Sequence, residues 1–67
     1  MHVESSAIRE IEYDHTRRRL QVTFVSGERY VYDRVPPRAH RAFLQSESKG
    51  RHFQAEIRDR YPYARLN

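Results

Sequence analysis

Apolar and polar residues alternate on either side of a glycine turn in the first half of this chain. The apolar positions of the pattern lie two residues apart, at Leu20, Val22, Phe24, Tyr30 and Tyr32. Because side chains of a β-strand point alternately to its two faces, these residues share one face. The pattern therefore predicts a β-hairpin that turns at Ser26-Gly27-Glu28, with Gln21 and Thr23 on the opposite face.

A further strand is expected before this hairpin, over residues 6–14. Its alternation slips between Ile8 and Ile11, which predicts a bulge in the strand. The polar stretch at 14–18 then turns the chain back. Together the three segments predict an antiparallel meander with one apolar face.

The register of the meander follows from the requirement that the apolar faces coincide. The first turn would place Tyr13 opposite Leu20, and a three-residue loop over residues 26–28 would place Phe24 opposite Tyr30. Both pairings put the apolar residues of all three strands on one face. This agreement is the main support for the two hairpins.

A proline pair marks the change from sheet to helix. Proline suits the first turn of a helix, where its missing N–H costs no hydrogen bond. Pro36-Pro37 therefore predicts a helix over residues 37–46. Ala39, Ala42 and Phe43 form its apolar stripe, with Leu44 as a further candidate.

A second helix is expected over residues 49–60. Ser48 suits its N-cap position, and Gly50 is expected at the bend between the helices, where a positive φ would suit it. Steps of four residues place three side chains on the inner face of this helix: Phe53, Ile57 and Tyr61. Pro62 ends the helix and leaves residues 63–67 as a tail.

The predicted fold class is α+β, a three-stranded antiparallel β-meander covered by two C-terminal helices (β-β-β-α-α). A chain of 67 residues forms a single domain, 1–67, with its core over residues 5–66. It has no cysteine, so neither a disulfide nor a cysteine-based metal site can stabilise it. No segment approaches the roughly 18 apolar residues of a membrane span, and the N-terminus has no signal-peptide pattern. These features predict a monomer in the cytoplasm.

Positive charge is concentrated in the C-terminal half. The formal net charge is +4, with twelve arginines and one lysine. Residues 1–33 have a net charge of −1, whereas residues 34–67 have +5. Arginine favours planar, bidentate contacts with phosphate or carboxylate groups. The asymmetry favours an anionic partner, although a charged surface that only keeps the protein soluble explains it equally well.

Taken in order, the motifs resemble those of the KTSC domain. The matching residues run along most of the chain: Tyr30, Tyr32, Val35-Pro36, Ser48, Gly50, Phe53, Ile57-Arg58 and Tyr61. That family is named after the C-terminal extension of some lysyl-tRNA synthetases and includes small free-standing bacterial proteins. The resemblance implies a suspected role in RNA binding but no known activity. One departure is His40, where the family often carries an aromatic residue in the first helix.

The candidate binding surface is the basic side of the two helices. It comprises Arg38, Arg41, Ser48, Lys49, Arg51, His52 and Arg58. Arg51 and Arg58 are seven residues apart and so share a helical face. RNA, tRNA included, or another nucleic acid is the partner that this surface predicts. Ser48 and Gly50 also suit an ordinary cap and turn, and Arg58 can instead pair with a carboxylate of the sheet.

Tyr30 and Tyr32 allow two interpretations. Aromatic side chains on an open sheet face can stack on the bases of a single strand. The same two residues share a face with Leu20, Val22 and Phe24, however, and this favours a place in the core.

No catalytic or metal-binding constellation is evident in the sequence. The four histidines are scattered, without the spacing that a metal site needs, and two glycines are too few for a glycine-rich phosphate loop. No cofactor is therefore expected. The predicted function is a small non-catalytic module that binds RNA or another nucleic acid. The alternatives are a protein-interaction domain and, third, a nuclease that uses His52 with Arg51 or Tyr61.

Overall fold

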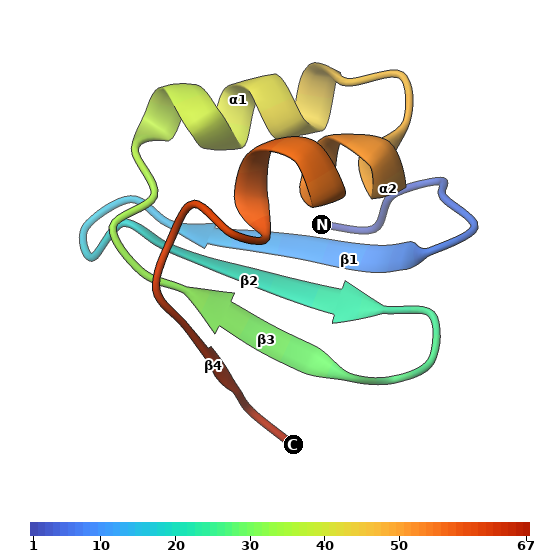
Figure 1. Ribbon diagram of the computed structural model, residues 1–67, viewed down its shortest axis with the longest axis horizontal. Helices are drawn as coiled ribbons and strands as arrows, with labels where there is room; N and C mark the ends of the chain where they lie inside the picture. The colour runs from blue at the N-terminus through green and yellow to red at the C-terminus, as the bar shows by residue number, and fades with distance from the viewer.

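Four antiparallel strands form one sheet in the order β1-β2-β3-β4, and the helices lie on one of its faces (Figure 1). The computed structural model describes residues 1–67. In chain order its elements are β1 (Ile8–Asp14), β2 (Arg19–Phe24), β3 (Arg29–Tyr32), α1 (Pro37–Gln45), α2 (Lys49–His52), the π-helical segment η1 (Phe53–Ile57) and β4 (Tyr63–Arg65). The predicted α+β fold, a meander covered by two helices, is confirmed. The short strand β4 takes the place of the predicted tail.

The first hairpin has the predicted register, with Tyr13 opposite Leu20. The expected irregularity in β1 is present as a register shift between Ile8 and Glu10. Such a shift bends the strand locally and increases its twist. The apolar side chains of β1 and β2 therefore reach the helix-covered face together.

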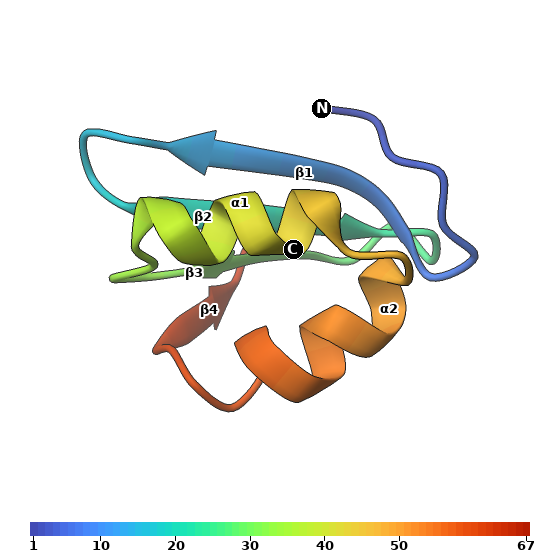
Figure 2. The ribbon, with the colours of Figure 1, turned by 90° about the horizontal axis from the view of Figure 1, so that it is seen from above.

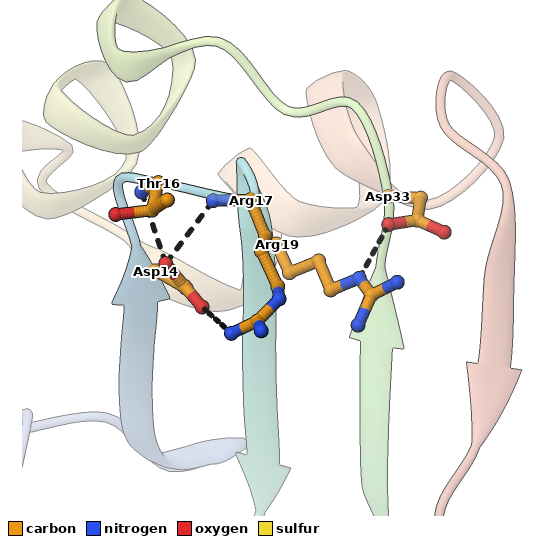
Figure 3. A network of polar contacts seen from close by, with 5 residues as sticks. All are labelled: Asp14, Thr16, Arg17, Arg19 and Asp33. Carbon is orange, nitrogen blue, oxygen red and sulfur yellow. Dashed lines mark hydrogen bonds and ion pairs between the residues drawn. The ribbon is translucent and has the colours of Figure 1, made fainter.

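Asp14 closes the turn of this hairpin (Figure 3). Its Oδ1 accepts hydrogen bonds from the backbone N–H groups of Thr16 at 2.9 Å and Arg17 at 3.1 Å. These bonds, the one from Arg17 most of all, lower the pKa of the Asp14 carboxyl, because they favour its charged form. On the neighbouring strand Arg19 Nε donates to Asp33 Oδ1 at 3.0 Å, which links β2 to the end of β3.

The second hairpin is shifted by two residues from the predicted register. Val22, rather than Phe24, lies opposite Tyr30. The loop spans residues 25–27, one residue earlier than predicted, because Gly27 closes it with a φ of 100° and donates its N–H to the carbonyl of Phe24 at 2.9 Å. Glycine adopts this φ without strain and takes the last position of such a loop. A shift of two leaves every side chain on its predicted face.

Thr23 lies on the outer face of the sheet, as predicted, and is nevertheless buried. Its side chain is buried, at 5% exposure, whereas Gln21 on the same face is half-buried. The cross-strand neighbours of Thr23 are Glu10 and Arg29. The long stems of such side chains cover a small residue that lies between them.

The N-terminal residues run along the free edge of β1. His2 forms a bridge with Glu10, and the N–H of Val3 donates to the carbonyl of Arg9 at 3.1 Å. Seen from above, this segment lies beside β1 on the side away from β2 (Figure 2). Val3 is buried and belongs to the core. The segment therefore covers an edge that would otherwise be open to pairing with another chain.

The core lies between the sheet and the helices. Its largest fully buried side chains come from both layers: Phe43, Ile8, Ile11, Leu20, Ile57, Val22 and Val35. α1 begins at Pro37 as predicted and buries Phe43, but Ala42 of the predicted stripe is exposed. None of the helices has the length and apolarity needed to cross a membrane.

The second helix lies where it was predicted but changes form along its length. Ser48 caps it as expected, because its Oγ accepts a hydrogen bond from the Arg51 N–H at 3.3 Å. After residue 52 the turns become π-helical, and the N–H of Arg58 donates to the carbonyl of Phe53 at 2.9 Å. The predicted inner face is retained, with Phe53 and Ile57 buried and Tyr61 half-buried.

The predicted bend at Gly50 is wrong. Gly50 lies inside α2 and does not have a positive φ. The chain turns instead at residues 46–48, where Ser46 and Ser48 have extended backbone conformations. A Cβ on Gly50 would lie 3.4 Å from the Cβ of Ala7, which is a van der Waals contact with a single side-chain atom.

Candidate functional site

The predicted basic residues lie on α1, on α2 and directly after η1. Arg38 and Arg41 are exposed on α1, and Arg51 is exposed on α2. Arg58 is also exposed, and its Nη1 donates to Oε1 of Gln54 at 3.0 Å. None of these four arginines lies within ion-pair distance of a carboxylate. Their guanidinium groups are therefore available to an anionic ligand.

Two of the side chains in the first turn of α2 already interact with other groups of the protein. Lys49 Nζ donates to the carbonyl of Ser46 at 2.6 Å. The ring of His52 is stacked on Phe43, with centroids 5.5 Å apart and planes within 15°. Lys49 keeps two N–H donors for a ligand, since an ammonium group has three. Arg51 is thus the side chain of this turn that is fully free.

Four arginines outside the predicted surface are paired with acids. The pairs are Arg17–Asp14 at 3.5 Å, Arg19–Asp33 at 3.0 Å, Arg60–Glu56 at 3.9 Å and Arg65–Glu28 at 3.4 Å. Their side chains are exposed, so each pair contributes little to stability. They do, however, neutralise part of the positive charge outside the predicted surface.

The predicted site residues form two groups. Lys49, Arg51 and His52 belong to α2, with Ser48 as its N-cap, and Arg58 follows η1 directly. Arg38 and Arg41 belong to α1, which lies next to that helix in both views (Figures 1 and 2). No hydrogen bond or ion pair joins the two groups. A ligand that spans both helices would be needed to connect them.

A groove of about 600 Å³ lies between η1 and the edge of the sheet. Five aromatic side chains line it: Phe24, Tyr30, Tyr32, Phe53 and Tyr63. Gln54, Arg58 and Asp59 provide polar groups on the helical side of the same groove. One of the predicted basic residues, Arg58, therefore also belongs to an aromatic cleft. The sequence pattern gave no indication of this cleft.

The tyrosines of the groove differ sharply in exposure. Tyr32 is 3% exposed, so it is a core residue, as its shared face with Val22 predicted. Burial, together with the neighbouring phenol of Tyr30, raises the pKa of Tyr32 to about 12. Tyr63 is 62% exposed, although its ring centroid lies only 5.6 Å from that of Tyr32. Sequence reasoning missed Tyr63, because a strand of three residues carries no recognisable alternation.

His40 of α1 packs its ring against the sheet. Its imidazole is stacked on Tyr13, with centroids 4.4 Å apart and planes within 16°. The Tyr13 hydroxyl donates to the carbonyl of Val35, which fixes the phenol at the start of α1. Burial first, and then the nearby His15, lower the pKa of His40, since both disfavour its charged form. The histidine therefore packs as an aromatic ring.

The structure does not assemble a recognisable catalytic group around His52. The His52 ring faces Phe43, and it forms no hydrogen bond with Arg51 or Tyr61. No group of three or more histidine, cysteine, aspartate or glutamate side chains is arranged to hold a metal ion.

This chain is similar to known proteins over most of its length. A model of the family described as the KTSC domain matches residues 4–61. A relative from Stutzerimonas stutzeri (strain A1501), described as an uncharacterized protein, is 38% identical over 66 residues. That match covers 97% of this chain and 93% of the relative.

Two further matches connect the chain to a solved fold and to a larger enzyme. The crystal structure of a KTSC domain protein from Yersinia pestis superposes with a TM-score of 0.94 at 37% identity, covering 100% of this chain and 94% of that one. A lysine–tRNA ligase from Nostoc punctiforme is 31% identical over 64 residues. This match covers 96% of the present chain but only 11% of the ligase.

Proposed function

This chain belongs to the KTSC domain family, and we propose that it is a small non-catalytic module that binds RNA through the basic surface of its two helices. The surface consists of Arg38, Arg41, Lys49, Arg51 and Arg58, with Ser48 and His52 in the first turn of α2. We further propose that the protein acts as a monomer in the bacterial cytoplasm. The likeness to part of a lysine–tRNA ligase makes tRNA the first RNA to test.

One observation carries this proposal. None of the five cations of the surface is neutralised by a carboxylate, whereas four of the eight arginines elsewhere are paired with acids. Phosphate groups supply the missing anions, and a guanidinium matches their geometry with two parallel N–H donors. A surface of this kind binds the backbone without reading the base sequence.

A protein-interaction domain is the second candidate. Val25 and Tyr63 are large apolar side chains that are 53% and 62% exposed, and both line the groove. Exposed apolar side chains that lie together are typical of contact surfaces for other proteins. The nuclease is the third candidate, and the absence of RNA cleavage on incubation with the purified protein would dismiss it.

Equilibrium titration of fluorescently labelled RNA tests the proposal. The probes are tRNA, single-stranded RNA and single-stranded DNA at low salt. The test variant is Arg41→Gln/Arg51→Gln, which removes one unpaired cation from each helix. The matched control is Arg17→Gln/Arg19→Gln, which removes the same charge from arginines that are already paired with acids.

We expect the helix variant to bind all sequences about tenfold more weakly and the control to bind nearly as well as the unmodified protein. Equal losses in the two variants would mean that only net charge matters. Failure of the unmodified protein to bind any of the three probes would overturn the proposal in favour of a protein partner.

A further inference from the structure

The aromatic groove is lined by an exposed tyrosine ring and by an arginine without an acidic partner. Tyr63 and Arg58 line the same groove, one from β4 and the other from the end of η1. We propose that this groove binds one unpaired base of a single-stranded nucleic acid, stacked on the Tyr63 ring, with the adjoining phosphate at Arg58. This inference rests on the proposed function and assigns the site where a base, as opposed to the backbone, is held.

The dimensions of the groove suit a single base with its sugar. Pockets for small ligands typically enclose about 300–1,000 Å³, and this groove measures about 600 Å³. Its inner wall is aromatic: the Tyr30 and Tyr63 rings are 5.8 Å apart, and Phe24 meets Phe53 edge to face at 5.1 Å. Such a wall offers a planar ligand dispersion contacts without demanding a particular base.

Tyr63 is held in place although its side chain is exposed. Its strand pairs with β3, with Tyr63 opposite Tyr32. Beyond the strand, Asn67 clamps the chain to the second hairpin: its Oδ1 accepts from the Arg29 N–H at 2.9 Å, and its Nδ2 donates to the Gly27 carbonyl at 3.1 Å. A platform that is already ordered loses little conformational entropy when a ligand stacks on it.

The polar groups of the groove match a base better than an apolar peptide side chain. Glu28, one of its two carboxylates, is paired with Arg65 at 3.4 Å, which reduces its repulsion of phosphate. The Asp59 carboxylate can accept N–H groups from the edge of a base, and the Gln54 amide can donate its N–H groups while its Oε1 accepts from Arg58. An apolar occupant would form no hydrogen bond with the Asp59 carboxylate or with the Gln54 amide N–H groups.

A pair of probes separates base stacking from backbone binding. The first is a labelled ten-nucleotide RNA, and the second is a ribose-phosphate strand of the same length that lacks bases. The variants are Tyr63→Leu, which keeps an apolar side chain but removes the ring, and Tyr63→Phe, which keeps the ring. Because the side chain is exposed and β4 pairs through its backbone, both variants are expected to fold; thermal melting verifies this.

We expect Tyr63→Leu to bind the RNA about 5- to 100-fold more weakly, and Tyr63→Phe to bind it nearly as well as the unmodified protein. Neither change should alter binding of the strand without bases. Equal binding of both probes by the unmodified protein would overturn this inference and leave the proposed function intact, provided that Arg41→Gln/Arg51→Gln still weakens binding. Failure to bind either probe would overturn both.

Discussion

The rings of Tyr32 and Tyr63 lie side by side at the edge of the sheet, with centroids 5.6 Å apart and planes inclined by 31°. One belongs to the core and the other to the surface, at 3% and 62% exposure. The pair therefore joins the hydrophobic core to the candidate groove. A ligand that stacks on Tyr63 would therefore contact a ring that packs against a buried core residue, Tyr32.

The burial of Tyr32 predicts a distinct titration. Its pKa is about 12 in the folded protein, against an ordinary value of 10.0. The folded state therefore keeps the proton longer, and the stability from this group is complete below pH 10 and is lost as the pH rises from 10 toward 12. Ultraviolet absorbance should show a phenol that ionises near pH 12, and Tyr32→Phe should remove this transition. A single transition near pH 10 for all phenols would contradict the assigned burial.

The two glycines predict opposite responses to alanine. At Gly27 the φ of 100° opposes any Cβ, so Gly27→Ala should cost about 1–2 kcal/mol of unfolding free energy, although nothing lies within 4 Å of the added atom. Gly50 has helical neighbours, and its added Cβ would meet only the Cβ of Ala7 at 3.4 Å. Gly50→Ala should therefore be neutral or stabilise by up to about 1 kcal/mol, measured by urea unfolding. Equal losses at both positions would show that Gly50 is also strained.

The assigned faces of β2 predict unequal effects of a new charge. Val22 is fully buried, so Val22→Asp should destabilise the fold by about 3–5 kcal/mol and leave it largely unfolded. Gln21→Asp places the same charge on the open face and should cost less than about 1 kcal/mol. Gln21 is the better control than Thr23, which is itself buried. Similar melting temperatures for the two variants would refute the assignment of Val22 to the inner face and Gln21 to the outer face of β2.

His40 predicts a dependence of stability on pH. Its folded pKa lies below the ordinary 6.5, so the unfolded chain binds the proton more readily. The stability from this group is therefore complete above pH 6.5 and is lost as the pH falls through 6.5 toward the folded pKa. His40→Phe keeps the ring on Tyr13 and should reduce the loss of melting temperature between pH 7.5 and 5. An unchanged pH profile in that variant would assign the effect to other groups.

The sequence predicted the register of the first hairpin correctly and that of the second incorrectly. The difference is that the turn and the apolar pattern together allow one register in the first hairpin, whereas the apolar pattern of the second fits more than one. The pairing of Tyr13 with Leu20 was predictable because one turn brings both apolar faces together. In the second hairpin, registers that differ by two residues place the same side chains in the core, so periodicity could not choose between them. The position of Gly27 at the end of the loop made that choice.

The basic residues of the candidate site could be predicted from the sequence, but its aromatic groove could not. Their spacing predicted that Arg51 and Arg58 share one helical face; Arg51 lies in α2, and Arg58 follows the π-helical segment η1 directly. The carbonyl partner of Lys49 and the aromatic partner of His52 depend on how the helices pack, which spacing does not reveal. Strand β4 is held by backbone pairing and by Asn67. No alternation of apolar and polar side chains therefore indicates that Tyr63 lies in a strand.

The salt dependence of RNA affinity tests the central claim most directly. If the basic helical surface binds phosphates, log Kd should rise with log salt concentration by about 0.7 per contact for a single strand, or about 1.4–2.8 for two to four contacts. Arg41→Gln/Arg51→Gln removes two contacts and should lower this slope by about 1.4, and Arg17→Gln/Arg19→Gln should leave it unchanged. A slope near zero, or one that the helix variant does not alter, would contradict nucleic-acid binding by this surface.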